Sequence, residues 1–186
     1  MYRKYILISI VIILISIAIL FSMGRLPFCK CEVISIWSSD VMSSEQSQQF
    51  ADPYTFTHII HGIALYFLLW LAFGRRLNTL QRFVLAIGME SAWEILENTD
   101  YVINRYREAT ISLDYYGDSI FNSVGDIIAM AVGFFAAWKF PKKVSFGIVV
   151  LIELLLLYFI RDNLTINIIM LIHPIESLKH WQAGIQ

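Results

Sequence analysis

The feature that most constrains this chain is a series of apolar runs, each long enough to cross a lipid bilayer as one helix. The hydrocarbon core of a bilayer is ~30 Å thick, and a helix needs about 20 apolar residues to cross it. The runs are residues 6–22, 55–73, 80–97, 119–138 and 144–160. The composition agrees, because 58% of the residues are hydrophobic and 16% are charged, whereas soluble domains have about a quarter charged residues. We predict an all-α membrane helix bundle of about five spans, in which residues 1–186 form one membrane domain.

The first run has the features of a membrane anchor. It follows the basic residues Arg3 and Lys4, an arrangement that signal peptides and anchors share. A signal peptidase site needs small residues in a small-x-small pattern after the apolar run. Because residues 22–25 (Ser-Met-Gly-Arg) fit that pattern poorly, we expect an uncleaved signal anchor.

The charge of the chain argues against nucleic acid as a partner. The formal net charge is −1 at pH 7, whereas nucleic-acid-binding domains normally have a basic patch and a high pI. We therefore expect no nucleic-acid binding, and the sequence leaves protein partners open.

The distribution of lysine and arginine predicts the orientation of the spans. Cytoplasmic loops of membrane proteins are enriched in these residues, most strongly in short loops beside span ends. The pairs Arg75–Arg76 and Lys142–Lys143 lie in such loops. We therefore expect a bacterial inner-membrane protein with a cytoplasmic amino terminus and an extracytoplasmic carboxyl terminus. The outer loops 24–53 and 98–118 and the tail 161–186 then lie outside.

The tail contains one further apolar segment, residues 164–172. Its nine residues are too few to cross a bilayer, so an interfacial or re-entrant helix is the better interpretation. Trp181, near the end of the chain, suits the headgroup layer of a membrane.

Two cysteines, Cys29 and Cys31, follow the anchor with one residue between them. This spacing is tight for an ordinary disulfide, and two cysteines are too few for a zinc site. We favour two thiols with a local structural role. Pairing with each other, or with another chain, is the alternative if the loop faces an oxidising compartment.

Polar residues repeat at helical spacing in the third and fourth spans, so each set lies on one face of its helix. The sets are Glu90, Glu94 and Glu97 in the third span, and Asp118, Asn122 and Asp126 in the fourth. Charged side chains are costly in lipid, so these faces must meet each other or line a water-filled cavity. We predict a polar cleft that opens to the outside and closes near the middle of the bilayer.

Two histidines, His58 and His61, lie three residues apart at the outer end of the second span. This spacing allows one divalent metal to be bound if a carboxylate from another helix completes the site. Hydrogen-bonded structural histidines and acid–base catalysts are the alternatives. We predict that His58, His61, Glu94 and Asp126 are catalytic, with His58, His61 and Glu94 as the candidate metal ligands.

Three arginines on the predicted outer side are candidates for holding an anionic headgroup: Arg105, Arg107 and Arg161. A guanidinium group binds phosphate or carboxylate oxygens in pairs. Ion pairs within the loops are the alternative. The remaining candidates for substrate binding are Glu90, Glu97, Asp118 and Asn122.

Several motifs together resemble an uncharacterised family of small bacterial inner-membrane proteins, known as a domain of unknown function. They are residues 57–62 (THIIHG), 90–98 (ESAWEILEN), 105–110 (RYREAT), 113–123 (LDYYGDSIFNS) and 160–164 (IRDNL). The resemblance covers nearly everything from Gly24 to Gln182, and it implies location and topology but no reaction. Gln49 stands where the family pattern leads us to expect a histidine, which weakens a metal role for the outer loop.

A more distant resemblance is to the VanZ-like membrane proteins. It rests on polar residues in three successive spans, namely His58, Glu94, Asp118 and Asn122, followed by Gly125. This resemblance also implies no established reaction.

The polar cleft favours a membrane-embedded hydrolase or transferase that acts on a lipid or lipid-linked anionic substrate from the extracytoplasmic side. One alternative is a small transporter or lipid-binding accessory protein with a carboxylate-lined cavity, and another is a structural membrane protein. A transporter needs polar residues through the inner halves of the spans. Those halves hold few beyond Asn78, Gln81 and the flanking basic residues, which favours a site open on one side.

Overall fold

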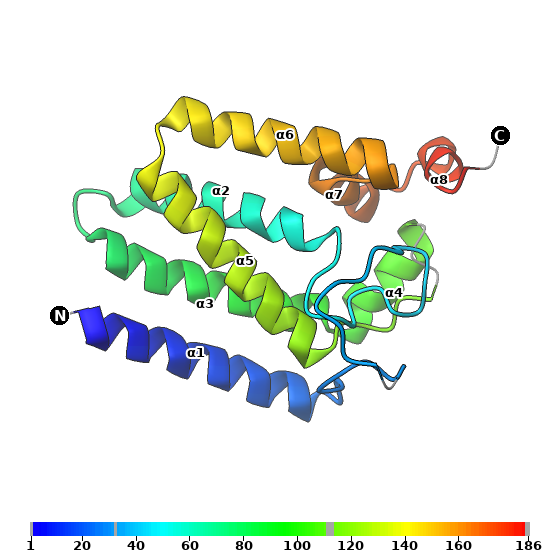
Figure 1. Cartoon of the computed structure of the whole chain (residues 1–186), viewed down its shortest axis with the longest axis horizontal. Helices are drawn as coiled ribbons and strands as arrows, with labels where there is room; N and C mark the ends of the chain where they lie inside the picture. Colours follow the sequence, from blue (N-terminus) through cyan, green and yellow to red (C-terminus); the bar gives the residue numbers. More distant parts are fainter. Residues whose placement is uncertain (1, 32, 111–113, 185–186) are drawn as a thin grey trace.

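The computed structural model describes residues 2–31, 33–110 and 114–184, which form an all-helical bundle (Figure 1). The helices are α1 Tyr2–Ser22, α2 Thr55–Phe73, α3 Thr79–Glu97, α4 Asp100–Ala109, α5 Ile120–Lys139, α6 Lys142–Ile160, α7 Leu164–Ile172 and α8 Glu176–Gln182. The five long helices fall on the five apolar runs. The fold class predicted from those runs is therefore confirmed.

Four of the described helices, α1, α2, α5 and α6, are long and apolar enough to cross a membrane. α3 has the same length as α2, 19 residues, but it carries Arg82 and three glutamates and does not reach the same apolarity. It nevertheless packs against α1, α2 and α5 in the bundle. The charges on α3 are mostly turned inward, because Arg82, Glu90 and Glu94 are buried.

α5 lies at the centre of the bundle. In Figure 1, α1 (blue) and α6 (yellow to orange) lie on opposite sides of the group formed by α2, α3 and α5. The central position of α5 agrees with burial, because 61% of its most apolar stretch is buried, compared with 17% for α1 and 11% for α6. The outer faces of α1 and α6 are rich in exposed leucine, isoleucine and phenylalanine, as expected for helices that face lipid.

Two glycines allow α2 and α5 to cross in backbone contact. A Cβ atom on Gly62 would lie 1.9 Å from the carbonyl oxygen of Met130, and one on Gly133 would lie 2.0 Å from that of Ile59. Small residues at helix crossings are typical of membrane bundles, where close packing replaces the hydrophobic effect as the source of association. The crossing fixes the two helices that carry His58 and Asp126.

An apolar core fills the bundle on the side of the short α2–α3 and α5–α6 turns. It consists of Leu65, Leu69, Ala86, Ile87, Ile127, Met130 and Phe134. The opposite end of the bundle carries the longer connections together with α4, α7 and α8 (Figure 1). The polar residues singled out in the sequence lie between this core and that end.

One predicted loop contains a helix. The polar segment 98–118 was expected to be a loop, and this expectation is wrong for α4, while residues 111–113 lie outside the described part. Thr99 caps α4 by accepting a hydrogen bond from the Val102 backbone N–H, and Asp100 lies in its first turn, where a negative charge is favourable. α4 has ten mostly polar residues, so it lacks the apolar length by which the spans were recognised.

The predicted short helix in the tail is confirmed as α7. Asn163 caps its first turn by accepting from the Ile166 N–H at 2.8 Å. Glu153 of α6 also accepts from the backbone N–H groups of Leu164 and Thr165. These bonds satisfy donors that the first turn of a helix leaves free, and they fasten α7 to the end of α6.

Cys29 and Cys31 form a disulfide with each other. The prediction of two free thiols is therefore wrong, and the alternative of local pairing is the one observed. The Cα atoms of the two residues lie 5.2 Å apart, which is within the range that a disulfide bridges.

Asp162 joins the amino end of α2 to the connection between α6 and α7. Its carboxylate accepts from the Tyr54 hydroxyl at 2.9 Å, the Asn163 N–H at 2.9 Å and the Asn167 amide at 3.4 Å. Burial raises the pKa of Asp162 to about 6, although these hydrogen bonds act to lower it.

We predict that exchange of Gly133 for alanine lowers stability, because the new methyl group must push α5 away from α2. Overpacking of this kind costs about 1–3 kcal/mol. The Tm of the purified protein in detergent measures the effect. Gly147→Ala in α6 is the matched control, because a Cβ there meets nothing within 4 Å and alanine favours helix by up to about 1 kcal/mol. Equal Tm changes in the two variants would contradict the crossing.

We also predict that Asp162 makes the protein less stable as the pH rises from 4 to 7. The folded-state pKa, about 6, lies above the ordinary value of 3.8. Stability linked to this carboxyl is thus fully present below pH 4 and is lost as the pH rises through 6, by about 3 kcal/mol at most. In Asp162→Asn this loss disappears. Tm curves of wild type and variant that run parallel over this pH range would refute the prediction.

Candidate functional site

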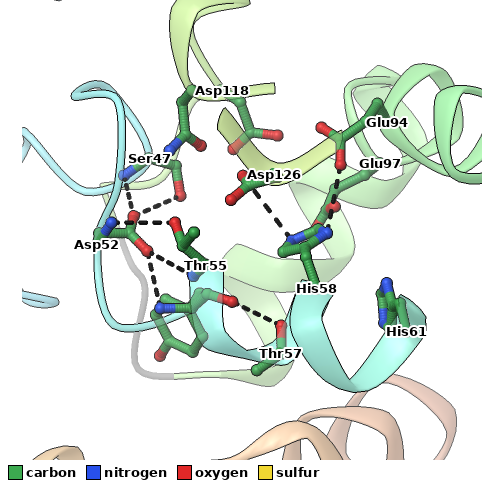
Figure 2. Close-up of polar contacts among 12 residues, drawn as sticks. Ser47, Asp52, Thr55, Thr57, His58, His61, Glu94, Glu97, Asp118 and Asp126 are labelled. Carbon is green, nitrogen blue, oxygen red and sulfur yellow. Dashed lines mark hydrogen bonds and ion pairs between the residues drawn. The ribbon is translucent and has the colours of Figure 1, made fainter. Parts of the chain in front are cut away.

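Seven acidic and histidine side chains from α2, α3, α5 and the segment before α5 gather in what we call the polar cluster. Its members are His58, His61, Glu90, Glu94, Glu97, Asp118 and Asp126. In Figure 2 the side chains of Glu94 and Asp126 reach His58 from two sides, while His61 follows one turn later on α2. The prediction that the acidic faces of the third and fourth spans meet each other is thus confirmed by the positions of these side chains.

Glu90 joins the two histidines. One oxygen of its carboxylate, Oε1, lies 2.6 Å from Nδ1 of His58 and 3.0 Å from Nδ1 of His61. A carboxylate accepts hydrogen bonds, so each imidazole donates from Nδ1. A neutral imidazole that donates from Nδ1 keeps a lone pair on Nε2. Glu90 thereby leaves two Nε2 atoms able to accept a proton or bind a metal.

His58 is surrounded by three carboxylates. Besides Glu90, the Glu94 oxygen Oε1 lies 3.5 Å from Nδ1, and Asp126 Oδ2 lies 3.8 Å from Nε2. All four side chains are at least nine-tenths buried. Both carboxylate oxygens of Glu94 and Oδ1 of Asp126 have no hydrogen-bond partner among the described residues. This part of the cluster therefore has acceptors without donors, in contrast with most buried polar groups in proteins.

The other two carboxylates of the cluster are hydrogen-bonded. Asp118 accepts from the Asn98 amide at 2.8 Å and from the Tyr115 hydroxyl at 2.9 Å. Glu97 accepts from the Tyr106 hydroxyl at 2.9 Å. Burial raises the pKa of Asp118 to about 6, even though the bonds from Tyr115 and Asn98 lower it. These two carboxylates thus already have partners from the α3–α4 turn, from α4 and from the loop after it.

The loop before α2 is fastened to the start of that helix by Asp52. Its carboxylate accepts from the backbone N–H groups of Ser47, Tyr54 and Thr55, at 2.9, 2.7 and 3.2 Å (Figure 2). Carboxylates are favourable at a helix amino terminus because the free N–H groups and the helix dipole both attract negative charge. Asp52 therefore positions the first turn of α2, which leads to His58.

The same loop is fastened to the start of α5. Ser119 caps α5 and donates its hydroxyl to the Gln48 carbonyl, while Asn122 donates its amide to the Gln49 carbonyl at 2.9 Å. Gly125 allows this contact, because a Cβ there would lie 1.9 Å from the carbonyl oxygen of Phe50. Asn122 was predicted to bind substrate, but its amide is used to hold this loop.

A cavity of about 220 Å³ lies beside the polar cluster. One wall is polar and includes His58, His61, Glu97, Asp118 and Asp126. The rest of the lining is largely apolar and includes Trp93 of α3 and, beside Asn167, Leu164, Ile168 and Leu171 of α7. The spacing i, i+4, i+7 places the three α7 residues on one helix face. The cavity therefore has the two kinds of surface that an amphipathic molecule requires.

Glu90 and Glu94, which were predicted to line the cleft, lie behind its wall. They contact His58 but are not among the residues that border the cavity. Both are buried beside His58, as expected for charged side chains that avoid lipid. Depth along the helix separates them from Glu97, which lies nearer the carboxyl end of α3 and borders the cavity.

The three predicted headgroup-binding arginines lie outside the cavity. Arg105 donates to the carbonyl groups of Leu171 and Ile172 at the end of α7, Arg107 donates to the Tyr115 carbonyl, and Arg161 donates to the Trp181 carbonyl. Among the described residues that border the cavity there is no arginine or lysine. Their contact with a headgroup stays a prediction, while their observed bonds position α7, α4 and α8.

Sequence reasoning missed the aromatic and amide residues that complete the site. Tyr54, Tyr106 and Tyr115 border the cavity, and Asn98 holds Asp118. All four belong to loops or to α4, where no helical repeat connects them to the acidic residues. Burial raises the pKa values of Tyr106 and Tyr115 well above the ordinary value, so both hydroxyls stay protonated as donors.

Comparison with known proteins places the chain among bacterial relatives. The family described as "Protein of unknown function (DUF2585)" matches residues 20–184. The UPF0314 protein of Paracoccus denitrificans is 47% identical over 176 residues, covering 95% of this chain and 90% of the relative. The UPF0314 proteins of Sinorhizobium fredii and Sphingopyxis alaskensis are 51% and 45% identical, covering 88% and 96% of this chain and 82% and 94% of theirs.

No solved structure matches this one. The family match extends from the end of α1 to the end of α8 and so includes the whole polar cluster. The resemblance seen in the sequence motifs is thereby confirmed. The chain belongs to the DUF2585 family of bacterial proteins.

Proposed function

We propose that this protein is a membrane-embedded hydrolase or transferase that acts on a lipid or lipid-linked substrate from the extracytoplasmic side of the inner membrane. The observation that carries the proposal is the cavity beside the polar cluster, whose lining combines His58, His61 and Asp126 with apolar side chains of α7. Such a cavity holds the polar part of an amphipathic substrate against acid–base groups and its apolar part against leucine and isoleucine side chains.

His61 is the general base in this proposal. Its side chain is 21% exposed, compared with 8% for His58, so it is the imidazole more open to substrate or water. Glu90 holds Nδ1, and Nε2 then accepts a proton from the attacking hydroxyl group or water. A carboxylate that orients an imidazole in this way also stabilises the imidazolium that forms.

The apolar core supports a site that is open on one side rather than a transport path. Leu65 and Leu69 of α2, Ile87 of α3, and Met130 and Phe134 of α5 pack together on the inner side of the polar cluster. A transporter for a polar substrate needs polar groups along the whole route. The alternative of a lipid-binding protein without turnover is compatible with the same cavity, and an activity measurement separates the two.

We predict that a carboxyl-terminal reporter detects the extracytoplasmic side. Alkaline phosphatase fused after Gln186 should be active, and green fluorescent protein at the same position should be dark, since each reporter functions on one side of the inner membrane. The control fusion ends after Arg76, between α2 and α3, where the reverse result is expected because basic residues flank that turn. Fluorescence of the fusion after Gln186 would contradict the orientation.

We predict that the purified protein converts a component of bacterial membrane lipid. Incubation with a total lipid extract, followed by mass spectrometry, should show one lipid class decreasing and its product increasing. His61→Ala should lower the rate by about 10²–10⁴-fold, the usual contribution of a general base, while the variant still unfolds in one cooperative thermal transition. His180→Ala is the control, because that imidazole is 62% exposed and does not border the cavity.

Two outcomes would count against the enzyme. Lipid that copurifies with the wild-type protein but is not converted would indicate a lipid-binding accessory protein. Conversion at equal rates by wild type and His61→Ala would remove His61 from the reaction.

A further inference from the structure

The polar cluster has an excess of acceptors at one point. Around His58, the carboxylates of Glu94 and Asp126 together offer three oxygens without a hydrogen-bond partner among the described residues. Glu94 is 0% exposed and Asp126 5% exposed, so bulk water does not supply the missing donors. Buried carboxylates are normally paired, protonated or bound to a metal.

We infer that His58, Glu94 and Asp126 bind one divalent transition-metal ion, Zn²⁺ or Mn²⁺. One ligand atom from each residue lies within 4.8 Å of the other two, and the three side chains converge in Figure 2. Asp126 Oδ2 lies 3.8 Å from His58 Nε2. Two ligand atoms that are each ~2.1 Å from one ion are separated by about 3–4 Å, so the observed separation fits a shared ion.

Glu90 fixes the orientation that such an ion needs. It holds Nδ1 of His58 at 2.6 Å, which directs the lone pair of Nε2 toward Asp126. A metal-binding histidine commonly donates its second ring N–H to a carboxylate in this way, and this hydrogen bond makes the imidazole a better ligand.

Two other groups of residues in the cluster are close enough to hold a metal but are occupied by protein contacts. In the group His58, His61 and Glu90, Glu90 is engaged with Nδ1 of both imidazoles. In the group Glu94, Glu97 and Asp118, Glu97 and Asp118 accept hydrogen bonds from Tyr106, Tyr115 and Asn98. The set with free oxygens and a free nitrogen is therefore His58, Glu94 and Asp126. It differs from the ligands predicted from sequence in having Asp126 in place of His61.

The ligand types select the ion. Mg²⁺ and Ca²⁺ favour sites built from oxygen alone, whereas an imidazole with carboxylates suits Zn²⁺, and carboxylates also suit Mn²⁺. Two charges on the ion balance the two carboxylates of Glu94 and Asp126. Because His58 and Asp126 border the cavity, the remaining coordination positions face the space where substrate binds.

The metal deepens the proposed function, since it would supply a positive charge that the described lining residues lack. An ion at this position attracts the phosphate or carbonyl oxygen of a lipid headgroup. This explains how the cavity takes an anionic substrate while Arg105, Arg107 and Arg161 are engaged elsewhere.

The test measures binding of the metal alone, without lipid or turnover. The full-length protein in detergent is stripped with a chelator and titrated with Zn²⁺ or Mn²⁺ in a calorimeter, with Mg²⁺ as the comparison ion. We expect one Zn²⁺ or Mn²⁺ per chain and weaker binding of Mg²⁺. Glu90→Gln should weaken binding about 10–100-fold, the usual effect of losing a carboxylate that orients a ligand, and Glu94→Gln and Asp126→Asn should weaken it at least as much.

Two matched variants locate the ion. His61→Gln should weaken binding far less than Asp126→Asn does, because His61 is not a ligand in the inferred site, and Glu176→Gln should retain wild-type affinity because that carboxylate is 77% exposed on α8. If His61→Gln abolishes binding while Asp126→Asn retains it, the ion lies between the two histidines and the inference is wrong. Absence of binding by the stripped wild-type protein would also overturn it.

Folding is checked on the same samples. Bound metal should raise the Tm of the wild type with increasing ion concentration, because an ion that binds the folded state stabilises it, and this rise should be lost in Glu94→Gln. Visible absorption by Co²⁺ bound to the wild-type protein reports occupancy of the metal site without any variant. If the protein binds the metal but converts no lipid, the metal site stands and the proposed enzyme activity is refuted. If metal-free protein converts lipid, the enzyme activity stands and a role of the metal in it is refuted.

Discussion

The structure depends on how an apolar bundle keeps several carboxylates inside it. Charges in a membrane interior are stable when they pair with one another or face water, and here a single oxygen of Glu90 accepts from both His58 and His61. This contact joins α2 to α3, and Asp126 brings α5 to the same point. The three central helices are therefore connected through these polar side chains, and the Gly62–Gly133 crossing and the apolar core hold them together as well.

Much of this arrangement follows from the sequence by simple periodicity. Apolar length predicted the long helices, and the spacing of Glu90, Glu94 and Asp126 predicted faces that had to meet. Both predictions depend on one physical quantity, the cost of exposing a charge to lipid, which acts along each helix and needs no knowledge of loops. This cost also places Glu90 among the buried polar residues. Its role as partner of both histidines depends on how α2 and α3 are rotated about their axes, which periodicity along one helix does not determine.

The parts that sequence reasoning missed depend on contacts between segments far apart in the chain. Arg105 was interpreted as a ligand for anions because it is a free guanidinium in a loop, yet it donates to carbonyl groups at the end of α7. The end of any helix leaves carbonyl groups without partners, and an arginine on a neighbouring segment satisfies them as well as a phosphate satisfies the arginine. The sequence cannot distinguish these two uses, because the difference is set by where α4 and α7 meet.

The loop before α2 shows how the site is covered without a further helix. Its backbone carbonyls at Gln48, Gln49 and Phe50 lie directly on the first turns of α5, because Gly125 has no Cβ to exclude them, and Asp52 holds the same loop to the start of α2. A polar loop in this position covers the end of the bundle that carries Asp118 and Asp126, while α7 contributes apolar side chains to the lining of the cavity. In the proposed function, the polar part of a substrate meets the groups ordered by this loop and by Glu90, and its apolar part meets α7. The two kinds of lining surface therefore follow from which segments pack near the amino ends of α2 and α5.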